Sequence, residues 1–156
     1  MTNVIGTHWQ EAIAQSANEI AMYALGELET RVEHPIAVTH DVSCSAGAHI
    51  PLLGGSQPLE LAIVSSPDGC EALARAMLGT DGPLTPAEIA DALGELVNML
   101  AGGVKRRLQA HGTELELGLP IFIRGHVEPT DRVSIVALPI DFGPTKTRVL
   151  TIGRRL

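Results

Sequence analysis

An acid and a carboxamide, Glu95 and Asn98, stand three positions apart in a stretch that otherwise consists mainly of apolar and small residues. Side chains with this spacing are neighbours on the surface of an α-helix. Gly94 and Gly102 flank the pair, and such small residues allow another backbone or side chain to come close. The pattern therefore indicates a surface that presents two hydrogen-bonding groups to the active site of another protein.

The helix that must carry this pair is the best marked in the chain. Thr85, Pro86 and Glu88 combine an N-cap, a first-turn proline and a capping-box acid, and Gly112 ends the run. At about 100° per residue, its positions separate into an apolar stripe and a polar side. The stripe holds Ile89, Leu93, Leu96, Val97, Leu100, Val104 and Leu108. The polar side holds Glu88, Asp91, Glu95, Asn98, Gly102, Arg106 and Gln109.

Three glycines in this helix, Gly94, Gly102 and Gly103, need a physical reason. Each costs about 0.8–1 kcal/mol relative to alanine, so together they forfeit roughly 2–3 kcal/mol of helix stability. Clearance for an approaching partner would explain that cost. Close packing of the helix on the protein's own sheet would explain it equally well.

The remaining elements predict a compact α/β domain. A first helix is expected to open with a capping box of Thr7 and Gln10, and a second runs from the cap Ser66 to Gly79. Strands are predicted over residues 36–42, 59–64, 115–123, 132–140 and 147–152. Gly143 and Pro144 separate the last two strands as a hairpin connection. The order is helix, strands, two helices, strands, in a single domain over residues 1–156 whose sheet is mostly antiparallel and flanked by helices.

Composition excludes several classes of protein. Of the 156 residues, 45% are hydrophobic and 19% charged, which excludes a disordered chain. The net charge of −7 argues against a nucleic-acid partner, because such affinity rests on neutralised phosphates. No apolar run approaches the roughly 18 residues of a membrane span, and the first residues lack the pattern of a signal peptide. We therefore expect a cytoplasmic protein in which Cys44 and Cys70 are reduced.

Residues 91–102, Asp-Ala-Leu-Gly-Glu-Leu-Val-Asn-Met-Leu-Ala-Gly, resemble the signature helix of the CheC/CheX chemotaxis phosphatases. The resemblance is closest to CheX-like members, which carry one such motif per chain. Leu119-Pro120 and Arg124-Gly125 resemble that family's Leu-Pro…Arg-Gly element. The similarity covers residues 5–155 in the order of elements, and residues 91–125 in specific motifs. It implies the CheC/CheX fold and, as in CheX-like relatives, a homodimer formed through the sheets.

The resemblance also implies a function and two catalytic residues. Asn98 would enter the active site of a phosphorylated CheY-type response regulator and orient the water that attacks the aspartyl phosphate. Glu95 would form a salt bridge with the regulator's active-site lysine. The Mg²⁺ of this chemistry belongs to the regulator, so no cofactor or metal of the protein's own is implied. An acyl phosphate is already reactive, so positioning the water is the remaining task and no nucleophile is needed.

Other candidate groups have simpler interpretations. Two-motif relatives carry a second Glu-x-x-Asn on the first helix, where this chain has Gln15 and Asn18. We interpret these two as ordinary surface residues, and a weak accessory role in docking is the alternative. The six histidines lack metal-ligand spacing and are interpreted as scattered surface residues. The basic run at residues 105–107 lies near a helix C-terminus, where the helix dipole favours cations. A contact with an acidic surface of the regulator is the alternative.

Two other functions remain open at this point. One is a non-catalytic module that binds a response regulator or dimerises, like the flagellar switch proteins that share the fold but lack the acid–amide pair. The other is a structural domain whose helix face is buried in a homodimer. The leading hypothesis is a phosphatase that terminates a two-component or chemotaxis signal.

Overall fold

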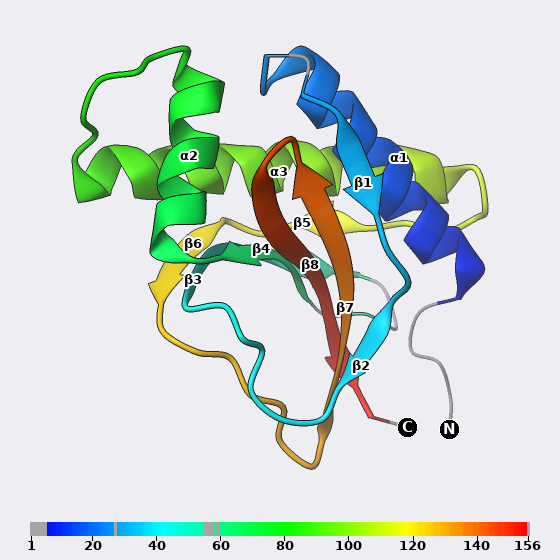
Figure 1. The fold of residues 1–156 in the computed structure, drawn as a ribbon. Helices are drawn as coiled ribbons and strands as arrows, with labels where there is room; N and C mark the ends of the chain where they lie inside the picture. Colours follow the sequence, from blue (N-terminus) through cyan, green and yellow to red (C-terminus); the bar gives the residue numbers. More distant parts are fainter. Residues whose placement is uncertain (1–5, 27, 55–57, 59, 156) are drawn as a thin grey trace.

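The computed structural model describes residues 6–26, 28–54, 58 and 60–155. Its three helices are α1 (Thr7–Tyr23), α2 (Pro67–Leu78) and α3 (Pro86–Gln109). Its strands are β1 (Thr30–Val32), β2 (Ile36–Val38), β3 (Ala46–Leu53), β4 (Glu60–Ser65), β5 (Glu116–Leu117), β6 (Ile121–Arg124), β7 (Val133–Phe142) and β8 (Thr145–Arg154). The order of elements is the one that the sequence predicts (Figure 1). None of the described helices has the length and apolarity that a membrane crossing requires.

The strands form one sheet in the order β1-β7-β8-β4-β3-β5, with β2 also paired to β7 and β6 also paired to β3. Every one of these pairs is antiparallel, which confirms the predicted class of fold. The longest pairing joins β7 and β8 through the predicted hairpin at Gly143 and Pro144. Gly143 has a φ of 56°, a left-handed conformation that glycine adopts without steric cost.

The helices form a layer over one face of the sheet. Figure 1 shows α3 lying across the sheet, with α2 crossing it near one end and α1 near the other. The main hydrophobic core lies between this layer and the sheet and draws on all three helices. A smaller apolar cluster lies apart from it on the sheet and consists of Val42, Ala62, Val64, Ile135, Ala137 and Leu150. The main core fixes α3 through its apolar stripe and leaves its polar side outside.

The helix caps predicted from the sequence are confirmed for α2 and α3 but not for α1. Ser66 caps α2 by accepting a hydrogen bond from the Gly69 N–H at 3.0 Å, and Gly79 ends that helix in the left-handed conformation. Thr85 and Glu88 form the predicted capping box of α3. The capping box predicted for α1 is wrong. Its N-cap is Gly6, which has no side chain and makes no capping hydrogen bond, so α1 depends on its buried face for stability.

Several strand predictions need correction. The chain forms β3 where no strand was predicted, because glycine, histidine and proline interrupt its apolar pattern. Pairing with β4 on one side and with β5 and β6 on the other supplies the stability that its composition lacks. The short strand β1 was also missed, and the strand predicted over residues 36–42 ends at Val38. Leu59, predicted to begin a strand, lies outside the described residues.

The strand predicted over residues 115–123 is two strands with an irregular step between them. Leu117 pairs with Leu52, whereas Ile121 pairs with His49. Three steps along β3 therefore correspond to four along this edge, as in a β-bulge. Pro120 lies in the step, where its missing N–H breaks no ladder hydrogen bond.

Candidate functional site

The polar pair on α3 is available to a partner. The opposite side of the helix is buried as predicted, with Leu93, Leu96 and Leu100 fully enclosed. Glu95 is exposed and Asn98 is half-buried. Within the described part of the chain, neither side chain has a hydrogen-bond or ion-pair partner. A carboxylate and a carboxamide thus stand side by side on a fixed helix with their hydrogen-bonding capacity unused.

The three glycines of α3 have three different surroundings. A Cβ on Gly103 would lie 2.7 Å from the Ser16 hydroxyl oxygen, so this glycine is needed for the packing of α3 on α1. A Cβ on Gly94 would make ordinary contact with Pro120 at 3.7 Å. A Cβ on Gly102 would meet nothing within 4 Å. Clearance for a partner therefore does not explain Gly103, and only Gly102 opens onto free space.

One side of the site is bordered by the segment that joins β5 and β6. Pro120 packs beside Gly94, and Lys105 of α3 forms an ion pair with Glu116 of β5 at 3.7 Å. Leu119 between them is 84% exposed. The element resembling Leu-Pro…Arg-Gly therefore lies alongside α3. Sequence reasoning noticed this element but could not place it beside the acid–amide pair.

The same element also supports the start of α3. The Arg124 guanidinium donates a hydrogen bond to the Pro86 carbonyl oxygen at 3.2 Å and lies 4.9 Å from the Phe122 ring centroid. The next residue, Gly125, donates its N–H to the Ser45 carbonyl oxygen at 2.8 Å with a φ of 150°. These contacts fix the helix against the sheet edge.

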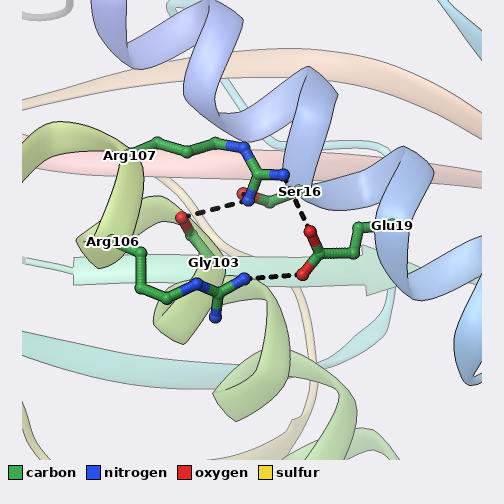
Figure 2. A network of polar contacts seen from close by, with 5 residues as sticks. All are labelled: Ser16, Glu19, Gly103, Arg106 and Arg107. Atoms are coloured by element: carbon green, nitrogen blue, oxygen red, sulfur yellow. Dashed lines mark hydrogen bonds and ion pairs between the residues drawn. The ribbon is translucent and has the colours of Figure 1, made fainter. Parts of the chain in front are cut away.

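The other end of α3 is joined to α1 by a polar clamp, defined here as Ser16, Glu19, Gly103, Arg106 and Arg107 (Figure 2). Glu19 accepts hydrogen bonds from Arg106 at 2.6 Å and from Arg107 at 2.8 Å. Arg107 also donates to the Ser16 hydroxyl at 3.2 Å and to the Gly103 carbonyl at 3.3 Å. The hydrogen bond from Arg107, together with the one from Arg106, lowers the pKa of the Glu19 carboxyl.

Ion pairs add to the interpretation of the basic run at residues 105–107. Arg106 and Arg107 lie in the last turn of α3, where the helix dipole favours cations, and all three cations also pair with carboxylates of other elements. Arg106 and Arg107 hold α1, and Lys105 holds β5. A contact with an acidic partner surface would have to compete with these ion pairs.

Gln15 and Asn18 of α1 stand where two-motif relatives carry a second Glu-x-x-Asn. Gln15 and Asn18 are both exposed, which confirms their interpretation as surface residues. Asn18 accepts a hydrogen bond from the Thr30 hydroxyl of β1. It also borders an open cleft of about 560 Å³ with Met22 and Leu28. Its carboxamide is thus engaged within the protein, unlike that of Asn98.

The histidines do not assemble a metal site among the described residues, where no group of three or more histidine, cysteine or acidic side chains gathers. The prediction that all six lie scattered on the surface is wrong for His49, which is buried, whereas His8 and His111 are exposed but stacked as a pair. His49 is buried on β3 with its Nδ1 2.6 Å from a Glu60 carboxylate oxygen. His8 and His111 stack with ring centroids 4.0 Å apart.

Both cysteines are free, as expected. Burial raises the pKa of the Cys70 thiol to about 11 and also raises the pKa of Cys44. Thiols with raised pKa values are poor nucleophiles at neutral pH. Neither cysteine is therefore suited to covalent chemistry, and the acid–amide pair stays the best candidate site.

Comparison with known proteins agrees with this arrangement. The model of the family described as "Chemotaxis phosphatase CheX" matches residues 46–141, a span that includes α3 and the Leu-Pro…Arg-Gly element. A crystal structure of a chemotaxis protein CheX from Desulfovibrio desulfuricans superposes with a TM-score of 0.81 at 16% identity, covering 94% of this chain and 99% of that one.

Two further structures extend the comparison. The CheX–CheY–BeF₃–Mg²⁺ complex from Borrelia burgdorferi has a TM-score of 0.74 at 18% identity, with 95% of this chain and 98% of that chain covered. FliY from Thermotoga maritima matches less well, with a TM-score of 0.64 at 14% identity and coverage of 97% and 92%.

These structural likenesses show that the chain has the same fold as these proteins, and at this level of identity they show the fold alone. No curated protein sequence matches the chain. The family model nevertheless spans more than half of the chain's 156 residues. The chain therefore belongs to the CheX family of chemotaxis phosphatases.

Proposed function

We propose that the protein accelerates hydrolysis of the aspartyl phosphate on a CheY-type response regulator, and so terminates a two-component or chemotaxis signal. The observation that carries the proposal is the pair on α3. Glu95 and Asn98 face outward together and have no partner within the described part of the chain. The family model that matches residues 46–141, a span that includes the pair, describes a chemotaxis phosphatase.

In this proposal Asn98 is the catalytic group. Its carboxamide can donate and accept hydrogen bonds at once, so it can hold a water molecule in line with the phosphorus–oxygen bond that breaks. The water's oxygen bonds to phosphorus, the aspartate oxygen leaves as a carboxylate, and inorganic phosphate is released. A hundredfold acceleration requires only about 2.7 kcal/mol, which one well-placed polar group can supply.

Glu95 is assigned to docking. Its exposed carboxylate is one helical turn from Asn98 and can pair with the lysine of the regulator's active site. The Mg²⁺ ion is expected in the regulator, which is why the chain needs no metal ligands of its own. The Borrelia burgdorferi complex contains a CheX, a CheY, BeF₃ and Mg²⁺, and it is the kind of assembly that we propose here.

A decay assay tests the proposed function. Each CheY-type regulator of the host is phosphorylated, freed of donor, and its phosphate is followed with and without the protein. We expect faster decay for at least one regulator at substoichiometric protein. Decay at the same rate for every regulator would overturn the proposal.

One alternative is a non-catalytic module of the same fold that binds a regulator or dimerises. The same assay separates the two functions. A regulator that binds the protein but keeps its full phosphate lifetime would favour the binding module. A homodimer through the sheet is proposed on either account, and analytical ultracentrifugation would test it.

A further inference from the structure

The sheet edge runs beside the exposed side of α3 in the opposite direction to the helix. Pro120 lies beside Gly94, and Glu116 pairs with Lys105, so residue numbers fall along the edge as they rise along the helix. In Figure 1, β5 and the chain that joins it to β6 run below the middle part of α3. Gly94, Asn98 and Lys105 share one side of α3, because they are separated by four and seven positions.

Asn98 therefore lies between the two points of contact. It is one turn beyond Gly94, which is about 6 Å along a helix that rises about 1.5 Å per residue. Extended chain covers about 3.3 Å per residue, so the same distance corresponds to one or two residues from Pro120 towards Glu116. The residues in that position are Leu119 and Gly118.

Leu119 is presented to solvent by a firmly held segment. It is 84% exposed, the largest exposed fraction among the large hydrophobic residues that the structure describes. On one side of it, the Gly118 N–H donates to the Pro51 carbonyl oxygen at 2.9 Å, and a Cβ on Gly118 would collide with the Pro51 ring. On its other side, Pro120 packs against Gly94. A side chain held this way loses little conformational freedom when a partner covers it.

We propose that Leu119 is an apolar docking contact for the regulator, covered by the regulator's surface next to its phosphorylated aspartate. A single exposed leucine is ordinary on protein surfaces. This one stands beside Asn98, so a regulator whose phosphate reaches Asn98 also reaches Leu119. The inference rests on the proposed function for the identity of the partner.

The acidic side chains of α3 also favour the regulator as the partner that covers Leu119. Glu88, Asp91 and Glu95 form an acidic row along the polar side of α3, and all three are exposed. The complementary surface is therefore basic, with an apolar patch at its border for Leu119. In the proposed partner, the active-site lysine and the bound Mg²⁺ offset the charge of the phosphoryl group and are the cations that this acidic row would face.

Binding measurements test the inference without relying on catalysis. The probe is a CheY-type regulator of the host held in its activated form by BeF₃⁻ and Mg²⁺, and isothermal titration calorimetry gives Kd for each variant. Leu119→Asp should raise Kd at least about tenfold, since burial of a leucine side chain is lost and a repelling carboxylate is added. Leu119→Met should restore binding to within about threefold of the wild type.

The matched control is Leu53→Asp. Leu53 is also an exposed leucine, at 52%, and the alternation of β3 turns it away from the helices because its neighbour Leu52 lies in the main core. The Kd of the regulator for Leu53→Asp should stay within about twofold of the wild-type value. Thermal unfolding should show that both aspartate variants are folded. Leu119→Ser provides a milder variant with an expected loss of about three- to tenfold.

Unchanged binding by Leu119→Asp, or equal weakening by Leu53→Asp, would overturn the inference whatever the decay assay shows. The inference would also be overturned if none of the host's CheY-type regulators bound the wild type. Binding that depends on Leu119 together with an unchanged phosphate lifetime would support this docking contact while rejecting the phosphatase. The two proposals can therefore fail separately.

Discussion

At the scale of the residue, we assign catalysis and docking to two different side chains within a single turn of helix. Asn98 is half-buried, whereas Glu95 is exposed. A half-buried amide is held in a defined position, which suits the orientation of water. An exposed carboxylate can reach a partner's cation before the surfaces meet, which suits docking.

Glu95→Ala should therefore raise the regulator concentration that gives half-maximal acceleration by about five- to tenfold, and leave the rate at saturation nearly unchanged. The loss corresponds to about 1–1.4 kcal/mol, the scale of one charge pair at a surface. Titration of the decay rate against the concentration of phosphorylated regulator measures both quantities. Glu11→Ala is the control, because Glu11 is an exposed acid on α1 and its loss changes the net charge equally. An equal effect of both substitutions would reject a specific role for Glu95.

The adjacent glycines of α3 provide a second prediction. Gly103→Ala should lower the free energy of unfolding by about 1–2 kcal/mol, because Ser16 must move away from the new methyl group. Gly102→Ala should raise it by up to about 1 kcal/mol, since the new methyl group meets open space and alanine favours the helix. Urea unfolding of both variants tests the pair. Equal effects would show that Gly103 is not in contact with α1.

At the scale of the element, the polar clamp links the C-terminal end of α3 to α1, whereas the capping box stabilises the N-terminal end of α3. Glu19 carries the link because both arginines donate to it. These hydrogen bonds hold the folded-state pKa of Glu19 below the ordinary value for glutamate, which is about 4.3. A group with a lowered pKa stabilises the fold above its unfolded pKa, and that stability is lost as the pH falls through the folded pKa.

Glu19→Gln should therefore be less stable than the wild type at pH 7, and the difference should shrink as the pH falls below about 4.3. We expect a difference of about 0.5–1 kcal/mol at neutral pH, because Glu19 is 36% exposed and solvent screens the pairs. Urea unfolding at pH 7 and at pH 3 measures it. A difference that is constant with pH would mean that the clamp does not depend on the charge of Glu19.

The elements also show which predictions local sequence can make. The caps of α2 and α3, the hairpin at Gly143 and the apolar stripe of α3 were predicted, because each depends on residues a few positions apart. The strand β3 was missed, because its stability comes from pairing with strands distant in sequence. The clamp joins residues 87 and 88 positions apart, and no local pattern signals it.

At the scale of the whole molecule, local sequence likewise predicts the candidate site residues but not the distant residues around them. Glu95 and Asn98 were found from their spacing and from the motif around them. Their surroundings could not be found, because Pro120 comes beside Gly94, and Glu116 beside Lys105, only when the sheet edge lies along α3. The family assignment and the class of fold followed from the motif and the order of elements.

A whole-molecule prediction concerns metal dependence. EDTA should leave the melting temperature of the protein unchanged, yet it should abolish the acceleration of phosphate decay, because the required Mg²⁺ is held by the regulator. Thermal unfolding with and without EDTA, and decay assays with EDTA and with Mg²⁺ restored, test both parts. A drop in melting temperature on chelation would indicate a structural metal in the protein itself.

The most direct measurement compares phosphate decay of the regulator with the wild type, with Asn98→Ala and with Asn18→Ala, each at saturating concentration. Asn18 is the matched control, because it is a surface asparagine on α1 that is already bonded to Thr30. We predict that Asn98→Ala loses at least about a hundredfold of the acceleration, about 2.7 kcal/mol, while still binding the regulator. Asn18→Ala should match the wild type. Full acceleration by Asn98→Ala would contradict the account.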